Sequence, residues 1–195
     1  MISFIVANGI AFILCAYLIN NLALYLSFPI LAILALYSYM KRFSQTAHLV
    51  LGLSLGLAPI AGVVAIEEGI TLWSVLLSLG VLFWVAGFDL IYSLQDEEFD
   101  KNIGLYSIPS MYGEKATLFI SAIFHGLSVL FWILFAWASS SGIFVYIGVA
   151  VCGAILLYEH MLVRGDKANI NKAFFTLNGF MGIFFLAMVI LDVLW

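Results

Sequence analysis

Acidic side chains concentrate in one short segment of this 195-residue chain, residues 87–109. Only 9% of the chain is charged, yet five of its eleven Asp and Glu residues lie there: Asp89, Asp96, Glu97, Glu98 and Asp100. In a helix that continues past Tyr92, residues three and four positions apart share a face, so Asp89, Tyr92 and Asp96 point the same way. Asp100 extends that face by one turn. The spacing therefore predicts three carboxylates on one side of a helix.

Carboxylates on one helix face repel each other unless a cation lies between them. Their hard oxygen atoms suit Mg²⁺, which proteins commonly bind through one or two carboxylates together with substrate phosphates. We therefore predict a Mg²⁺ site formed by Asp89, Asp96 and Asp100. The alternative is a solvated acidic loop. That alternative does not explain Asp89, which lies inside an apolar run, where an unpaired charge costs several kcal/mol.

The elements that must position these residues are membrane-spanning helices. Apolar residues make up 65% of the chain and its mean hydropathy is +1.17, which is more than a soluble core of this size can bury. Crossing a bilayer takes about 20 apolar residues. The chain has seven runs of about that length: 1–19, 22–39, 47–66, 71–92, 116–137, 143–163 and 173–195. The sequence predicts an all-α polytopic membrane bundle of seven transmembrane helices, with kinks at Pro29 and Pro59.

The basic residues predict the orientation of the chain. They all fall between the second and third, fourth and fifth, or sixth and seventh runs: Lys41, Arg42, Lys101, Lys115, Arg164, Lys167 and Lys172. Because short cytoplasmic loops are enriched in Lys and Arg, we expect the N-terminus and the acidic segment in the cytoplasm, and the C-terminus outside a bacterial inner membrane. The few cations form no extended basic surface, so nucleic acid is not expected as a partner.

Three histidines lie in three different runs, without the spacing of metal ligands: His48, His125 and His160. Packing or a hydrogen bond between helices is the expected role of each. Asn178 is expected to form a similar hydrogen bond or to face a cavity. Asp192, near the end of the last run, is expected to reach the membrane interface.

The acidic segment also resembles a known motif. Gly87-Phe88-Asp89 through Pro109 contains the pattern Asp-x-x-Tyr-x-x-x-Asp-x-x-x-Asp, which is similar to the second aspartate-rich motif of the UbiA family of intramembrane aromatic prenyltransferases. The segment Tyr37-Ser38-Tyr39-Met40-Lys41-Arg42-Phe43 resembles the family's Tyr-x-x-x-Lys-Arg-Phe/Tyr loop. His48, Leu51-Gly52 and residues 58–62 follow in the family's order. The resemblance covers essentially the whole chain and is strongest to the 4-hydroxybenzoate polyprenyltransferase branch.

This resemblance implies transfer of a polyprenyl group from a polyprenyl diphosphate to an aromatic acceptor, 4-hydroxybenzoate, in ubiquinone or menaquinone biosynthesis. It implies that Asp96 and Asp100, together with Asp89, hold Mg²⁺ against the diphosphate of the donor. Tyr92 would border the reacting carbon. The apolar walls of the bundle would house the isoprenoid tail.

The resemblance also implies roles for the cations. Lys41 would bind the diphosphate, and Arg42 would hold the carboxylate of the aromatic acceptor through a bidentate contact that lysine cannot copy. Lys101 would be a further substrate contact. Asp89, Tyr92 and Arg42 would be the catalytic residues. For Lys41 and Arg42 the alternative is a role in topology alone.

One departure from the family pattern affects the expected activity. The family has nine helices and a first aspartate-rich motif, Asn-Asp-x-x-Asp-x-x-x-Asp, which is not found in this sequence. We therefore expect residues 1–195 to form a single UbiA-type domain that lacks the first two helices. An inactive or complement-requiring fragment is one alternative function, and a non-enzymatic cation-binding protein or transporter is another. A transporter would show paired half-helices or an inverted repeat, and neither is evident.

Overall fold

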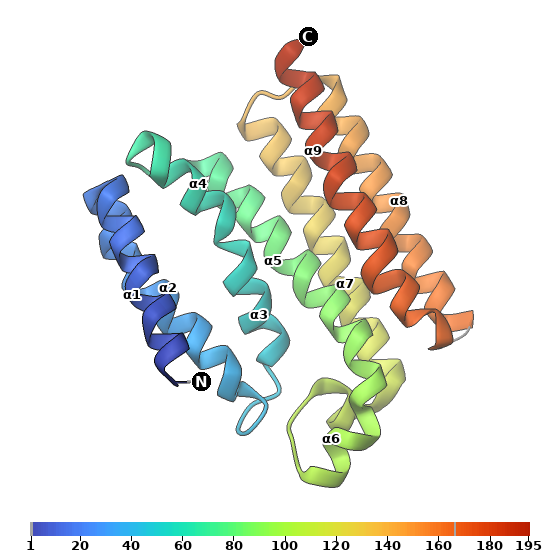
Figure 1. Cartoon of the computed structure of the whole chain (residues 1–195). Helices are drawn as coiled ribbons and strands as arrows, with labels where there is room; N and C mark the ends of the chain where they lie inside the picture. The colour runs from blue at the N-terminus through green and yellow to red at the C-terminus, as the bar shows by residue number, and fades with distance from the viewer. Residues whose placement is uncertain (1, 166) are drawn as a thin grey trace.

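The computed structural model describes residues 2–165 and 167–195, which fold into helices (Figure 1). The helices are α1 (Ile2–Ile19), α2 (Asn21–Met40), α3 (Ala47–Gly56), α4 (Ala58–Glu67), α5 (Leu72–Tyr92), α6 (Glu97–Ile103), α7 (Ile108–Ala138), α8 (Ile143–Gly165) and α9 (Asn178–Leu194). Short turns link some of them: the 3₁₀ segments Ser93–Asp96 and Lys167–Asn169 and the π-helical segment Lys172–Leu177. Among the described residues, seven helical spans are long and apolar enough to cross a membrane. The predicted all-α membrane bundle is confirmed.

The third predicted run is not one helix but two. Helix α3 ends at Gly56, Leu57 forms a turn, and α4 begins at Ala58. The helix is thus interrupted two residues before Pro59, as a full break and not the predicted kink: this proline lies in the first turn of α4, where its missing N–H would have had no partner in the helix. Pro29 lies inside α2, which remains one continuous helix.

The fourth predicted run, 71–92, matches α5, but the helix does not continue past Tyr92 into the acidic segment. Helix α5 stops at Tyr92, and the next four residues form a 3₁₀ turn before α6 begins at Glu97. A 3₁₀ turn has three residues per turn instead of 3.6, so the face that carries Asp89 and Tyr92 does not continue to Asp100. The α-helical spacing predicted beyond Tyr92 is wrong for this reason.

Helix α5 lies at the centre of the bundle and packs against both α3 and α7 (Figure 1). Gly52 of α3 lies so close to α5 that an added Cβ would collide with the carbonyl oxygen of Leu82. Gly87 of α5 lies equally close to His125 of α7, and the Ser121 hydroxyl donates a 2.7 Å hydrogen bond to the Gly87 carbonyl. Small residues and interhelical hydrogen bonds are the usual means of holding membrane helices together.

Helices α8 and α9 complete the other side of the bundle, where α9 fixes the start of α8. The Asp192 carboxylate accepts hydrogen bonds from the backbone N–H of Gly142 at 2.6 Å and of Phe144 at 3.1 Å. Asp192 therefore acts in place of an N-cap for α8, a role that was not predicted. Asn178 accepts a 2.7 Å hydrogen bond from the indole of Trp84, which confirms a hydrogen bond between helices.

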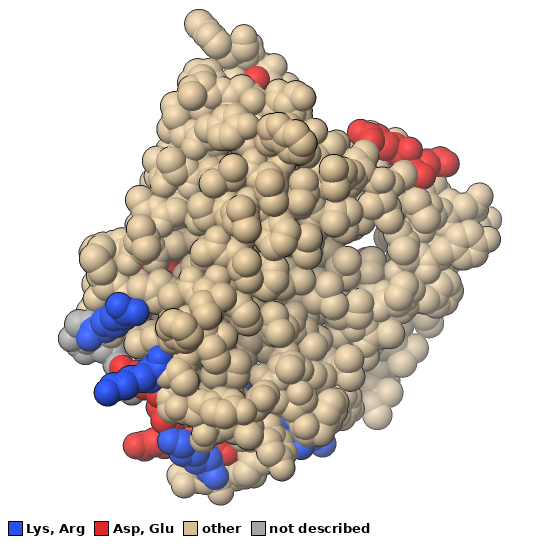
Figure 2. Space-filling view, turned by 180° about the vertical axis from the view of Figure 1, so that it is seen from behind, with Lys and Arg blue, Asp and Glu red and all other residues tan. Residues whose placement is uncertain are grey.

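The charged side chains are segregated along the bundle axis. Figure 2 shows Lys and Arg gathered toward one end, together with acidic side chains, while the opposite end carries acidic side chains only in that view. The α2–α3 connection, α6 and the end of α8 all lie at the basic end. The predicted placement of the basic loops on one side of the bundle is therefore reproduced.

Candidate active site

A polar cavity of about 350 Å³ lies at the basic end, between the end of α2, the start of α3 and the end of α5. Its walls bring together residues that are up to 68 positions apart in the sequence: Tyr37, Ser38, Lys41, Arg42, Ala47, His48, Asp89, Tyr92, Ser93, Asp96 and Leu105. Five of the seven predicted site residues are among them, namely Lys41, Arg42, Asp89, Tyr92 and Asp96. The other two, Asp100 and Lys101, do not line the cavity.

Asp89 lies at the inner end of this cavity, one turn before the end of α5. Its side chain is 18% exposed, and its Oδ2 lies 2.7 Å from Nδ1 of His48 on the first turn of α3. The imidazole is 1% exposed. An ionised carboxylate can only accept a hydrogen bond, so Nδ1–H of His48 is the donor. The expected hydrogen bond between helices is thus found, but its place in the site was not predicted.

Tyr92 forms the side of the cavity that leads to α9. Its ring lies 4.1 Å, between centroids, from the ring of Phe174 and 6.2 Å from that of Phe175. Phe174 in turn packs edge-on against Phe88, one turn before Tyr92 on α5. These aromatic contacts between α5 and the π-helical segment fix the Tyr92 ring in the wall. The negative face of an aromatic ring can stabilise a nearby cation.

Lys41 joins two of the acidic residues at the mouth of the cavity. Its Nζ lies 3.1 Å from Oδ2 of Asp100 and 3.8 Å from Oδ2 of Asp96. Asp96 is 51% exposed, whereas the Asp100 side chain is 2% exposed beneath the lysine. The Lys41 carbonyl also accepts a 2.7 Å hydrogen bond from the N–H of Tyr106. The lysine therefore ties α2 to both ends of the acidic helix α6.

Arg42 and Lys101 differ in their relation to the cavity. Arg42 is one of the residues that line it, and its guanidinium carbon lies 5.4 Å from the centroid of the Tyr39 ring, which is outside the lining. Lys101 instead forms an ion pair with Glu97 one turn earlier on α6, at 2.7 Å.

The carboxylates are not pre-assembled as a three-residue metal site. Within residues 2–165 and 167–195, no three His, Cys, Asp or Glu side chains converge in the manner of metal ligands. Asp89 and Asp96 do direct oxygen donors to one polar cavity that also contains two cations. That donor set fits Mg²⁺, because this ion usually takes one or two carboxylates and completes its octahedron with water and substrate phosphate oxygens.

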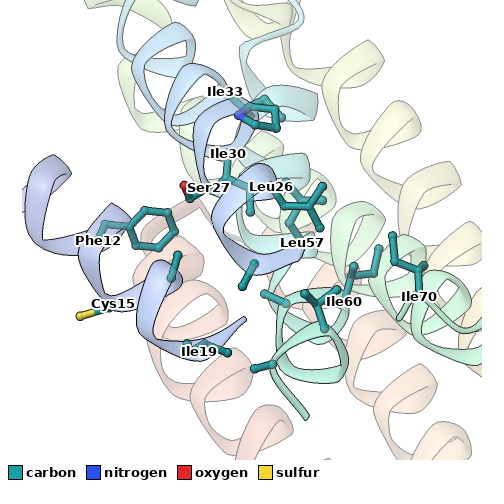
Figure 3. Close-up of a pocket in the computed structure, with 16 residues that line it drawn as sticks. Phe12, Cys15, Ile19, Leu26, Ser27, Ile30, Ile33, Leu57, Ile60 and Ile70 are labelled. Carbon is teal, nitrogen blue, oxygen red and sulfur yellow. The ribbon is translucent and has the colours of Figure 1, made fainter. Parts of the chain in front are cut away.

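An apolar cavity of about 370 Å³ follows the polar one along α2, and α1, α2 and α4 form its walls (Figure 3). Phe12, Leu26, Ile30, Leu57 and Ile60 are among the side chains that line it. Ile33 lines the apolar cavity and Tyr37 the polar cavity. These two residues are one helical turn apart on α2. An extended molecule with a charged head and a hydrocarbon tail therefore fits the two spaces in succession.

Comparison with known proteins gives the family of the chain. The family model of the UbiA prenyltransferase family matches residues 1–189. The chain belongs to the UbiA prenyltransferase family. The 4-hydroxybenzoate octaprenyltransferase of Francisella tularensis subsp. novicida (strain U112) is 30% identical over 185 residues, which cover 94% of this chain and 64% of that relative. The enzyme of the same name from Haemophilus ducreyi is 33% identical over 95% of this chain and 67% of its own length.

Solved structures of UbiA-type proteins have the same fold. The apo structure of a UbiA homolog from Aeropyrum pernix K1 superposes with a TM-score of 0.84 and 32% identity, over 96% of this chain and 70% of that one. A digeranylgeranylglyceryl phosphate synthase superposes with a TM-score of 0.75 and 25% identity, over 93% and 65% of the two chains. This UbiA-family chain spans less than two thirds of the length of the first curated relatives that it matches.

Proposed function

We propose that this UbiA-family chain transfers a polyprenyl group from a polyprenyl diphosphate to an aromatic acceptor, 4-hydroxybenzoate, in quinone biosynthesis. The observation that carries the proposal is the succession of the two cavities. A pocket with two carboxylates and two cations lies at the basic end of the bundle, and an apolar cavity lies further along α2, with Tyr37 lining the first and Ile33 the second. The diphosphate occupies the polar cavity and the isoprenoid tail the apolar one.

In this proposal Asp89 and Asp96, the two carboxylates that line the cavity, would hold Mg²⁺, and Asp100 beneath Lys41 would be the third acidic residue of the site. The bound ion supplies positive charge that stabilises the departing diphosphate. Lys41 already lies between the two acidic residues at the mouth, at 3.1 and 3.8 Å, so a rotation of its side chain is sufficient to reach a phosphate. Lys101, beside Glu97 on α6, adds positive charge at the same mouth.

In this proposal Arg42 and Tyr92 would hold the aromatic acceptor. Arg42 pairs with its carboxylate through two parallel N–H donors, a geometry that a planar guanidinium provides. The Tyr92 ring, fixed against Phe174, borders the allylic carbon and stabilises its developing positive charge. Bond formation then joins the allylic carbon to the acceptor ring, and the ring proton leaves to the carboxylates or water in the cavity.

The basic end, with its Lys and Arg side chains, faces the cytoplasm in this proposal, as the enrichment of cations in cytoplasmic loops predicts. The protein lies in a bacterial inner membrane. Diphosphate and aromatic acid then reach the polar cavity from the cytoplasm, whereas the tail enters from the bilayer.

Prenyl transfer by the chain in nanodiscs tests the proposal directly. With Mg²⁺, a polyprenyl diphosphate and 4-hydroxybenzoate, we expect a prenylated aromatic acid that depends on the metal. Asp96→Asn is expected to lower the rate by about 100-fold, the scale of losing one electrostatic catalytic group. Glu98→Gln changes an acidic residue in the first turn of α6 that does not line the cavity, and is expected to leave the rate within about 2-fold. Equal rates for both variants and the wild type would show that Asp96 has no such role.

A second candidate function is a chain whose activity needs complementing helices. The observation that favours it is the presence of only two carboxylates in the cavity, with no group of three metal-ligating side chains among the described residues. Co-expression with a helix pair that carries an Asn-Asp-x-x-Asp motif decides between the two candidates. Product formed only in the presence of this helix pair favours complementation, and product formed by the chain alone rules it out.

A further inference from the structure

His48 is the most deeply buried polar residue in the wall of the polar cavity, with 1% of its side chain exposed. Its Nδ1 is hydrogen-bonded to Asp89, and its Nε2 is buried without a hydrogen-bond partner. A buried polar side chain costs free energy unless its polar atoms are paired. The hydrogen bond to one carboxylate oxygen of Asp89 is thus the imidazole's one polar contact among the described residues.

The close packing of α3 on α5 allows this contact. Gly52 lies one turn after His48, and an added Cβ there would collide with the backbone of Leu82. At Gly56, one turn further, an added Cβ would lie 2.9 Å from the carbonyl oxygen of Ser78. The two helix backbones therefore approach closely enough for an imidazole on α3 to reach a side chain on α5.

The acidic residues of the site have different partners, and the bond between His48 and Asp89 explains the difference. Asp96 and Asp100 both turn to Lys41, at 3.8 and 3.1 Å. Asp89 lines the same cavity as Lys41 and is hydrogen-bonded to the imidazole. A lone carboxylate in an apolar span is expected to seek the nearest cation, because unpaired charge is costly there. The bond to His48 instead engages Oδ2 of Asp89, and no side-chain hydrogen bond to Oδ1 is found among the described residues.

We propose that His48 is a positioning residue that fixes Asp89 so that one carboxylate oxygen faces the cavity, ready to bind a divalent cation that carries a diphosphate. This inference rests on the proposed function of the cavity. Partners that orient a ligating side chain from behind typically change metal affinity or activity by about 10- to 100-fold when they are removed. His48 acts through Asp89 and needs no contact with the substrate.

Binding of Mg²⁺ and inorganic diphosphate to the chain in nanodiscs tests the inference without any prenyl transfer. Half-saturation is followed by the upward shift of the thermal unfolding midpoint, because a ligand that binds only the folded state stabilises it. His48→Leu removes the donor and is expected to weaken Mg²⁺ binding by about 10- to 100-fold. His48→Gln retains an N–H donor of similar reach and is expected to stay within about 3-fold of the wild type. Ser54→Ala removes a hydrogen bond elsewhere on α3 and is the matched control.

Combination with Asp89→Asn shows whether His48 acts through Asp89. If it does, the double variant His48→Leu/Asp89→Asn binds Mg²⁺ and diphosphate as weakly as Asp89→Asn alone, since the two changes remove the same interaction. Losses that multiply in the double variant would overturn the inference, as would a His48→Leu chain that binds like the Ser54→Ala control. If His48→Leu does not fold, His48→Met replaces it as the variant without a donor. Equal losses in His48→Gln and His48→Met would also overturn it.

The outcomes separate this inference from the proposed function. A chain that shows the expected His48 series in Mg²⁺ and diphosphate binding, but forms no prenylated product even with complementing helices, supports the positioning role and refutes the prenyl transfer. A chain that forms product at the wild-type rate and Mg²⁺ dependence after His48→Leu refutes the positioning role alone. Failure of the wild-type chain to bind Mg²⁺ with diphosphate refutes both.

Discussion

Replacing Lys41 by methionine is expected to destabilise the chain far more than removal of an ordinary surface ion pair. The Asp100 side chain is 2% exposed and its charge is paired with Lys41 at 3.1 Å. Removing one partner of a fully buried ion pair costs about 3–5 kcal/mol, because the other charge is left uncompensated. The Lys41 side chain is 34% exposed, so water screens part of the interaction and the expected cost is about 2–3 kcal/mol. For a chain of this length that lowers the unfolding midpoint by about 4–12 °C.

The measurement is thermal unfolding in nanodiscs, followed by tryptophan fluorescence. Lys101→Met is the matched control, because Lys101 is 49% exposed and pairs with Glu97 one turn away, an arrangement that contributes about 0.5 kcal/mol or less. Adding Asp100→Asn to Lys41→Met is expected to recover more than half of the loss, because the uncompensated charge is then absent. The reasoning fails if Lys41→Met melts within a degree of Lys101→Met, or if Asp100→Asn lowers the midpoint further.

Three other substitutions have expected outcomes in the same unfolding assay. Asp192→Ala removes the acceptor that caps α8 and is expected to cost about 1–2 kcal/mol; Asp192→Asn, which keeps an acceptor oxygen, should lose less. Gly87→Ala places a methyl group against His125 and is expected to cost about 1–3 kcal/mol, whereas Gly126→Ala, which meets nothing within 4 Å, should be neutral or slightly stabilising. Glu159→Leu removes a fully buried carboxyl group without a hydrogen-bond partner and is expected to raise stability by about 1–3 kcal/mol; a lower midpoint would show that the carboxyl has a partner.

The number of membrane spans and their helical structure were predictable. The apolar runs are long, and a span of such a run can satisfy its backbone hydrogen bonds only as a helix or a closed barrel. Seven apolar runs predicted seven spans, and the structure contains seven among the described residues. The division of the third span at Leu57 was not predicted. Hydropathy is the same on both sides of a turn when both halves remain in the membrane, so only Pro59 marked the place. That proline was interpreted as a kink within a helix, although it also suits the first turn of a new one.

Most of the charged residues that line the site were also predictable, because acidic and basic residues are rare in this chain. What spacing alone could not give was the local geometry after Tyr92. A 3₁₀ turn over Ser93–Asp96 rotates α6 so that Asp100 turns inward beneath Lys41 instead of extending the face of Asp89. Such turns depend on how α6 packs on the start of α7, and the periodicity of charges does not report that contact.

The pairing of the site residues was beyond the sequence because it joins segments that are far apart. His48 and Asp89 are 41 residues apart, and Lys41 and Asp100 are 59 apart. One signal was available for His48: it begins a predicted helix at the same membrane side as the acidic segment, so the two could meet. All three histidines lie in similar apolar runs, so the sequence did not show that His48 in particular would pair with an acidic residue. The other two, His125 and His160, pair with each other at 3.1 Å.

The pairings of Lys41 and His48 determine which carboxylate oxygens of the site are already engaged. The chain from Lys41 to His48 runs alongside the end of α5 in the opposite direction, so Lys41 meets the mouth residue Asp96 and His48 meets the deeper Asp89. Asp89 lies in α5, whereas Asp96 ends the 3₁₀ turn that follows it, and the two carboxylates have different partners. Asp96 is thus paired with the ammonium group of Lys41, and Asp89 with the imidazole of His48. In the proposed function Lys41 would leave its carboxylates for a phosphate, whereas His48, buried and bonded to a single oxygen, would keep Asp89 in place.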